Sequence, residues 1–243
     1  MTLPFVACLC PTYGRPRMAA NAWACFNAQD YPAERRALLI LDDADQLYRG
    51  QRDRAYIARQ ERAPSLPAKY NALVALAAGF WKPDILCVWE DDDLYLPGHV
   101  SAHVRALQQT GRPWSHPSRV WSDYPGRMVQ EESAGRFHAA LAFTRQGLQD
   151  VGGWPDTKRA DFDQMLMRRL RQRHGPPADP CEGTDPQYTF RWHTGHYHGQ
   201  GTMRSPDDET WYDRTPAPEI TERVELVPAM DDDTRRVYET LAK

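Results

Sequence analysis

Residues 85–93 read Ile-Leu-Cys-Val-Trp-Glu-Asp-Asp-Asp, so that five apolar side chains pass directly into four carboxylates. A short, continuous apolar run of this kind is typical of a strand that is buried on both faces, as in a parallel sheet. Four neighbouring acids repel one another and are costly to hold together without a neutralising partner. The stretch therefore predicts a buried strand that ends at a polar site.

Two earlier apolar runs end in the same way. Residues 5–10 stop at Pro11-Thr12-Tyr13, and residues 37–41 stop at Asp42-Asp43. Alternating strands and helices predict an α/β fold with a mostly parallel, Rossmann-like sheet that has helices on both faces. Ligands of such sheets bind beyond the carboxyl ends of the strands, so the three polar endings are expected to meet at one edge. Helical stretches follow the three runs, at about residues 17–28, 65–78 and 97–109.

The second half of the chain has weaker signals. Residues 119–124 and 137–144 are expected to be strands, and residues 161–173 are expected to form a helix. Gly152-Gly153-Trp154-Pro155 predicts a turn between them. After about residue 206 the periodicity is lost, which predicts an irregular C-terminal segment that wraps the surface.

The composition excludes several classes of protein. The chain has 243 residues and a net charge of −3, which provides no general attraction to nucleic acid or to anionic lipid. It contains no apolar run of about 18 residues that would span a membrane, and the N-terminus lacks the pattern of a signal peptide. Five cysteines without paired spacing fit a reducing compartment, so a cytoplasmic location is expected.

The four acids after residue 89 predict a divalent-cation site. Carboxylate oxygens suit Mn²⁺ or Mg²⁺, which commonly bind one or two carboxylates together with substrate phosphates. The alternative is a solvated acidic turn, because runs of charge are usually just exposed. The buried strand before the acids and the Leu94-Tyr95-Leu96-Pro97 exit favour the metal site.

In the order of its motifs, the sequence resembles glycosyltransferase family 2, whose members have the GT-A fold and use a nucleotide sugar with a DxD-type metal site. The resemblance covers about residues 5–170. Two positions depart from the family pattern, because Glu90 stands where Asp is frequent and Ala160 replaces the usual Glu. The matching segments are Pro11 to Pro16, Leu41 to Asp45, Lys69 to Asn71, Trp89 to Leu94, Val151 to Trp154 and Ala160 to Asp163.

The resemblance implies roles for individual residues. Asp161 is implied as the general base that takes the proton of the acceptor hydroxyl, with Asp163 as the fallback. Asp92 is implied as the direct metal ligand, with Glu90 as a supporting acid and His198 as a further, late ligand. The residues implied to contact the nucleotide sugar are Pro11, Thr12, Tyr13, Arg15, Asp42, Asp43, Lys69, Asn71 and Asp91.

Several of these residues also have a purely structural interpretation. Asp161 is suited to a helix N-terminus, where the dipole favours a carboxylate, and acids such as Asp42 are common in turns. His193, His196 and His198 lie in an aromatic-rich stretch that can equally form packing and an acceptor wall. The arginine-rich residues 168–173 are typical of a solvated helix face, with phosphate contact as the alternative.

The resulting hypothesis is an inverting, metal-dependent transfer of a sugar from a nucleotide donor, UDP-linked by resemblance, to an acceptor hydroxyl. The acceptor is a saccharide or a hydroxymethylated base in phage-type DNA. Two alternatives stay open, namely a metal-dependent nucleotidyltransferase and a non-catalytic carbohydrate-binding module. The chain lacks the Gly-rich phosphate loop that the first would usually have. The domains expected are residues 1–205 as one catalytic unit, with a nucleotide-sugar half (1–110) and an acceptor half (111–205), and a C-terminal extension (206–243).

Overall fold

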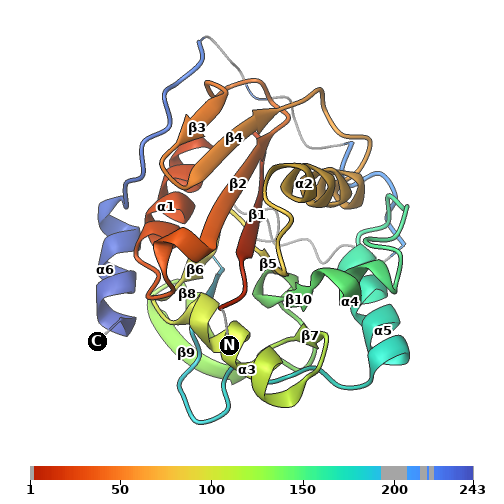
Figure 1. Cartoon of the computed structure of the whole chain (residues 1–243). Helices are drawn as coiled ribbons and strands as arrows, with labels where there is room; N and C mark the ends of the chain where they lie inside the picture. Colours follow the sequence, from red (N-terminus) through yellow and green to blue (C-terminus); the bar gives the residue numbers. More distant parts are fainter. Residues whose placement is uncertain (1–2, 193–206, 214–217, 219–221, 243) are drawn as a thin grey trace.

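The computed structural model describes residues 3–192, 207–213, 218 and 222–242, and a seven-stranded sheet forms its centre (Figure 1). The strand order is β3-β4-β2-β1-β5-β10-β7, with β4, β2, β1 and β5 parallel. β3 and β10 run antiparallel to their neighbours. The strands are β1 (Val6–Thr12), β2 (Arg36–Asp42), β3 (Gly50–Arg52), β4 (Ala55–Arg59), β5 (Ile85–Val88), β7 (Trp114–Ser115) and β10 (Ala142–Thr144).

The three central strands are those that the apolar runs predict. Every residue of β1, β2 and β5 is buried, because layers of helix cover both faces of the sheet. The parallel register aligns Thr12 with Asp42 and Leu9 with Val88. The carboxyl ends of the three strands therefore lie along one edge. β3 and β4, which extend the sheet beyond β2, were not predicted.

Helices cover both faces of the sheet, which confirms the expected α/β architecture. On one face lie α1 (Pro16–Asn27) and α3 (His99–Thr110), packed with the β1 residues Val6, Cys8 and Cys10. Ala7 and Leu9 point to the other face. The helices on that face are α2 (Leu66–Phe80), α4 (Arg145–Gln149) and α5 (Phe162–His174).

Two element boundaries show how local chemistry sets the fold. The Ser65 hydroxyl accepts from the Ala68 amide at 3.2 Å and caps α2, which continues through Gly79 to Phe80. The strand expected over residues 137–144 is wrong in its first half. Phe137 has a φ of 63°, a left-handed conformation that cannot continue a strand. The 3₁₀ helix η2 (His138–Ala140) follows it and turns the chain toward β10.

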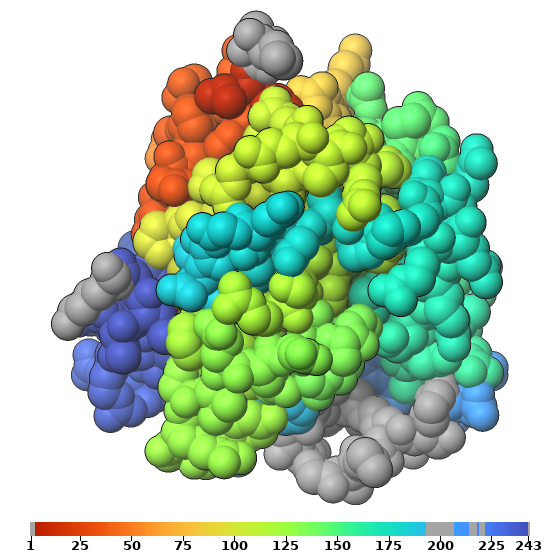
Figure 2. Space-filling model, turned by 90° about the horizontal axis from the view of Figure 1, so that it is seen from below, coloured from red at the N-terminus to blue at the C-terminus, as the bar shows by residue number. Residues whose placement is uncertain are grey.

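A second sheet forms beside the first. Its order is β6-β11-β8-β9, and β11 is antiparallel to β6 and parallel to β8. Figure 2 shows the segment that leads into β11 (cyan) between α3 and the β8–β9 hairpin (green). The second sheet thereby brings β11 alongside the exit of the acidic turn. Its strands are β6 (Leu94–Tyr95), β8 (Arg119–Tyr124), β9 (Arg127–Glu132) and β11 (Tyr188–Arg191).

The C-terminal segment contains a helix that the sequence did not predict. α6 (Asp232–Leu241) lies on the outer side of α1 (Figure 1). Asp231 caps it by accepting from the Thr234 amide at 2.8 Å, and it also accepts from Asn21 and Arg17 of α1. No helix among the described residues is long and apolar enough to cross a membrane. The remaining short element is η1 (Ala33–Arg35).

Candidate active site

The carboxyl ends of β1 and β5 meet where the strand order reverses. The chain builds β2 and β4 on one side of β1 and then places β5 on the other side. Open α/β sheets bind their ligands at such a switch point. A cavity of about 760 Å³ opens there, a volume typical of small-molecule sites. The sequence-predicted residues that line it are Pro11, Thr12, Tyr13, Arg15, Lys69, Glu90, Asp91, Asp92, Asp161 and Asp163.

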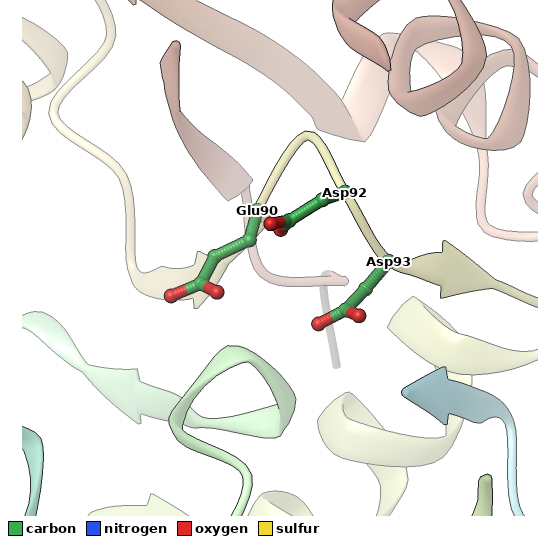
Figure 3. Close-up of side chains that lie close together, drawn as sticks. All are labelled: Glu90, Asp92 and Asp93. Carbon is green, nitrogen blue, oxygen red and sulfur yellow. The ribbon is translucent and has the colours of Figure 1, made fainter. Parts of the chain in front are cut away.

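Three carboxylates on the turn from β5 to β6 form a group suited to a cation. Oxygen atoms of Glu90, Asp92 and Asp93 all lie within 4.8 Å of one another, and Figure 3 shows their side chains on the same side of the turn. Hard carboxylate oxygens at this spacing fit Mg²⁺ or Mn²⁺. Asp93 was not among the predicted ligands, although it belongs to the same acidic run.

Asp91, the fourth acid, faces Arg15 instead. Its carboxylate accepts from Arg15 Nη2 at 2.5 Å and from the Thr12 hydroxyl at 2.7 Å, while Arg15 Nη1 donates to Asp92 at 2.9 Å. Burial raises the pKa of Asp91 to about 6 although Arg15 and Thr12 oppose this shift. Arg15 thus joins the β1 turn to the acidic turn through both Asp91 and Asp92.

Asp93 lies deepest in the acidic turn. The Tyr188 hydroxyl donates to its carboxylate at 2.5 Å and the Arg191 amide at 3.1 Å, so β11 supplies both donors. Burial, together with the charges of Asp92 and Glu90, raises the pKa of Asp93. A divalent cation would offset this repulsion.

Glu90 rests on a layer of buried rings that sequence reasoning missed. Its Oε1 accepts from the Tyr70 hydroxyl at 2.7 Å and lies 3.2 Å from His138 Nδ1. The Trp154 indole N–H in turn donates to His138 Nε2 at 2.8 Å. Tyr70 lies between Lys69 and Asn71, and Trp154 belongs to the Gly-Gly-Trp turn. Both residues are therefore within segments that resemble family 2. His138 had no such signal.

An arginine that also lines the cavity lies between two tyrosines. The Arg62 guanidinium carbon is 3.4 Å from the Tyr13 ring centroid and 4.0 Å from that of Tyr212. Lys69 donates from its buried ammonium group to the Thr12 carbonyl at 2.6 Å and to Asp43 at 2.5 Å. Burial lowers the pKa of Lys69, and Asp43 partly restores it. Arg62 and Tyr212 were not predicted, because their neighbours are distant in sequence.

Three predicted nucleotide-contacting residues are outside the lining of the cavity. Asp42 accepts from the amides of Ala44, Gln46 and Leu47, so it closes the turn after β2. Asp43 binds Lys69 and the Ala63 amide, and Asn71 forms two hydrogen bonds with the backbone of Trp154 at 3.0 Å.

Asp161 and Asp163 both line the cavity at the start of α5. Asp161 makes no capping hydrogen bond, and it accepts instead from Arg159 at 2.9 Å and from Arg168 at 3.1 Å. The hydrogen bond from Arg159 and, next, that from Arg168 hold the pKa of Asp161 below its usual range, although partial burial opposes them. Asp163 accepts from the Gln164 amide at 2.7 Å.

Two further predictions concern the late histidines and the arginine-rich stretch of α5. His198, with His193 and His196, falls outside the described residues. Arg168, Arg169, Arg171 and Arg173 are exposed along α5, and Arg168 is paired with Asp161. The structure therefore agrees with a solvated helix face over residues 168–173.

Solved structures share this architecture, whereas no protein-family model and no curated protein matches the sequence. Residues 1–349 of TarS from S. aureus, in complex with UDP-GlcNAc, match with a TM-score of 0.63 at 13% identity, over 86% of this chain and 64% of that chain. Mannosyltransferase PcManGT from Pyrobaculum calidifontis, in complex with GDP-Man and Mn²⁺, matches with a TM-score of 0.55 at 16% identity. The match covers 82% of this chain and 60% of that chain.

These similarities establish the fold of the chain. The chain has the GT-A fold found in these two glycosyltransferases, as its resemblance to family 2 implied. It spans less than two thirds of the length of either structure.

Proposed function

We propose that the protein is a metal-dependent glycosyltransferase that moves a sugar from a nucleotide donor to an acceptor hydroxyl with inversion. The observation that carries this proposal is the group of Glu90, Asp92 and Asp93 at the switch point of a GT-A sheet. The GT-A structures that the chain resembles hold UDP-GlcNAc in one case and GDP-Man with Mn²⁺ in the other.

In this reaction the bond between the sugar and the diphosphate breaks while the acceptor oxygen attacks the anomeric carbon. A bound Mn²⁺ or Mg²⁺ supplies Lewis-acid neutralisation of the charge on the leaving diphosphate. Asp92, Glu90 and Asp93 would hold the ion, and Arg15 would place a positive charge beside the phosphates. Asp91 orients Arg15 through their short ion pair.

The Tyr13–Arg62–Tyr212 stack is proposed as the nucleotide end of the site. Aromatic and guanidinium planes suit a base, and Pro11, Thr12 and Lys69 line the same cavity. Three predicted nucleotide-contacting residues would support the site without touching the donor. Asp42 fixes the turn after β2, Asp43 holds Lys69, and Asn71 holds the Trp154 turn. We propose UDP as the nucleotide.

Asp161 is proposed as the base that takes the acceptor proton, with Asp163 as the fallback. Its arginine contacts keep it ionised, and Oδ1, which accepts only from Arg159 Nε among the described residues, retains a lone pair for the acceptor hydroxyl. The acceptor is a saccharide or a hydroxymethylated DNA base. We also propose the cytoplasm as the location, because all five cysteines are free thiols in buried positions.

The test is transfer from a panel of sugar nucleotides in Mn²⁺, with Asp92→Asn as the diagnostic variant. Loss of one anionic ligand should lower transfer by about 100-fold or more, because a Lewis acid supplies several kcal/mol. Asp53→Asn, at an exposed position, is the matched control and should retain activity. Full transfer by the wild type in excess chelator would rule out the metal. Transfer of a nucleotidyl group instead of a sugar would identify a nucleotidyltransferase. Binding of a saccharide without any transfer would identify a carbohydrate-binding module.

A further inference from the structure

The hydrogen bonds around His138 determine which of its ring nitrogens carries the proton. An indole N–H can only donate, and Trp154 Nε1 lies 2.8 Å from His138 Nε2. His138 Nε2 must therefore present its lone pair. In the neutral ring the proton then resides on Nδ1, which faces Glu90 Oε1 at 3.2 Å and donates to it.

Tyr70 acts on the same carboxylate oxygen. Its hydroxyl donates to Glu90 Oε1 at 2.7 Å, so two donors from different elements converge on one atom. Within the described part of the chain, the other oxygen, Oε2, accepts no hydrogen bond from the protein. The carboxylate is thus held by one oxygen, while the second is left for the cavity that Glu90 lines.

The supporting rings are packed too tightly to turn. Tyr70, Trp154 and His138 are 0%, 1% and 6% exposed. Tyr70 stacks on Trp154 with ring centroids 4.8 Å apart and planes 9° apart, and His138 packs edge-on against both. Such buried rings have few alternative rotamers, so their polar atoms keep a fixed direction.

The backbone of the Trp154 turn is fixed as well. Asn71 donates to the Trp154 carbonyl and accepts from the Trp154 amide, both at 3.0 Å. Gly153 has a φ of 75°, and a Cβ there would lie 2.7 Å from the Asn71 side-chain oxygen. Only glycine permits this close approach. The line of support thus runs from Asn71 through Trp154 and His138 to Glu90.

We propose that His138 is a positioning residue, fixed by Trp154 in its Nδ1–H tautomer, which with Tyr70 orients Glu90 to bind the divalent cation. The proposal rests on the metal role given to Glu90 under the proposed function. Through one oxygen, Glu90 reaches both Tyr70 and His138.

The first test measures Mn²⁺ affinity by calorimetry in the presence of UDP. His138→Leu removes the donor to Glu90 and should weaken Mn²⁺ binding by about 10- to 100-fold, as is usual when a partner of a metal ligand is lost. His138→Asn is the matched variant, because its amide nitrogen takes the place of Nδ1, and it should restore most of the affinity. Equal affinity in wild type and His138→Leu would overturn the proposal.

The second test reads the tautomer directly and covers the case in which His138→Leu does not fold. Nitrogen chemical shifts of ¹⁵N-labelled histidine should show His138 protonated at Nδ1 and bare at Nε2. Trp154→Phe keeps a ring against Tyr70 but removes the indole donor, and it should abolish this preference. A proton on Nε2 in the wild type would refute the proposal that Trp154 fixes His138 as a donor to Glu90.

The two levels of the proposal fail in different ways. A wild-type protein that does not bind Mn²⁺ at all would overturn the metal role of Glu90 and with it the proposed function. Mn²⁺ binding that is unaffected by His138→Leu would overturn only the positioning role of His138. The proposed function would remain.

Discussion

At the scale of single residues, the site gives each carboxylate a different environment. Asp93 is buried under β11 and its pKa is raised, whereas Asp161 is partly exposed between two arginines and its pKa is lowered. Asp161 is therefore readily ionised, whereas a negative charge on Asp93 calls for a neutralising partner such as a cation. The assignment of roles can therefore be tested residue by residue.

Asp161→Asn should lower transfer by about 10²- to 10⁴-fold, because the amide cannot take the acceptor proton. UDP and Mn²⁺ binding should persist, since their proposed contacts are made by Tyr13, Arg62 and Tyr212 and by the acidic turn after β5. Asp163→Asn, two residues along the same helix, is the matched control and should be milder. Steady-state kinetics of both variants measures the two losses of transfer. A larger loss in Asp163→Asn than in Asp161→Asn would assign the base role to Asp163.

Metal binding should depend on pH through the buried acids. Because burial raises the pKa of Asp91 from 3.8 to about 6, its contribution to stability is fully present below pH 3.8 and is lost as the pH rises through about 6. A cation offsets the charge that then develops, so Mn²⁺ should raise the melting temperature more at pH 7.5 than at pH 5. Thermal unfolding with and without Mn²⁺ measures this. The prediction would be contradicted if the rise in melting temperature caused by Mn²⁺ did not depend on pH. It would also be contradicted if Asp91→Asn left this pH dependence unchanged.

At the scale of secondary structure, short polar contacts determine where the elements begin and how they dock. α6 depends on Asp231, which caps it and binds Asn21 and Arg17 of α1. Although burial alone would raise the pKa of Asp231, these hydrogen bonds hold it below its usual range. Its contribution to stability is therefore present above pH 3.8 and is lost in stronger acid.

Asp231→Ala should lower the free energy of unfolding by about 1–2 kcal/mol, as the loss of a cap does. The loss should be largest near neutral pH and should shrink as the pH falls below about 4. Denaturant unfolding measures the change, and hydrogen exchange of the α6 amides shows whether it is local. Asp232→Ala, at the exposed neighbouring position, is the control. Equal stability of the two variants would show that Asp231 does not anchor the helix.

At the scale of the whole molecule, distant parts of the chain close the cavity. Tyr212, from the C-terminal segment, stacks on Arg62 and its hydroxyl lies 3.3 Å from Asp43. Trp211 beside it stacks on Phe162 at the start of α5. The C-terminal segment therefore lines the cavity, at the position proposed for the nucleotide, as well as covering the surface.

Tyr212→Ala should weaken UDP binding by about 3- to 30-fold, because Arg62 loses the cation–π contact, worth roughly 0.5–2 kcal/mol, that holds its guanidinium in place for the base. Tyr212→Phe retains the ring and should bind almost as the wild type does. Calorimetric titration with UDP and Mn²⁺ compares the three proteins. Unchanged affinity in Tyr212→Ala would show that the base binds elsewhere.

The sequence by itself determined the parts of this protein that depend on local patterns. Apolar runs ending in polar residues predicted β1, β2 and β5, and their parallel arrangement predicted the edge where Thr12 and Asp91 meet. The GT-A fold followed from the order of the motifs. These inferences succeed because burial on both faces and a shared strand direction are encoded within a few adjacent residues.

Tertiary structure alone decided which polar groups are available. Asp42 and Asn71 have the residue types of a binding site, but backbone amides and the Trp154 turn occupy them. His138 and Tyr212 carry no local signal, and they reach the site because η2 and the C-terminal segment pack against it. The physical reason is that a hydrogen bond or a ring contact depends on distances between chain segments far apart in sequence, which residue order does not specify.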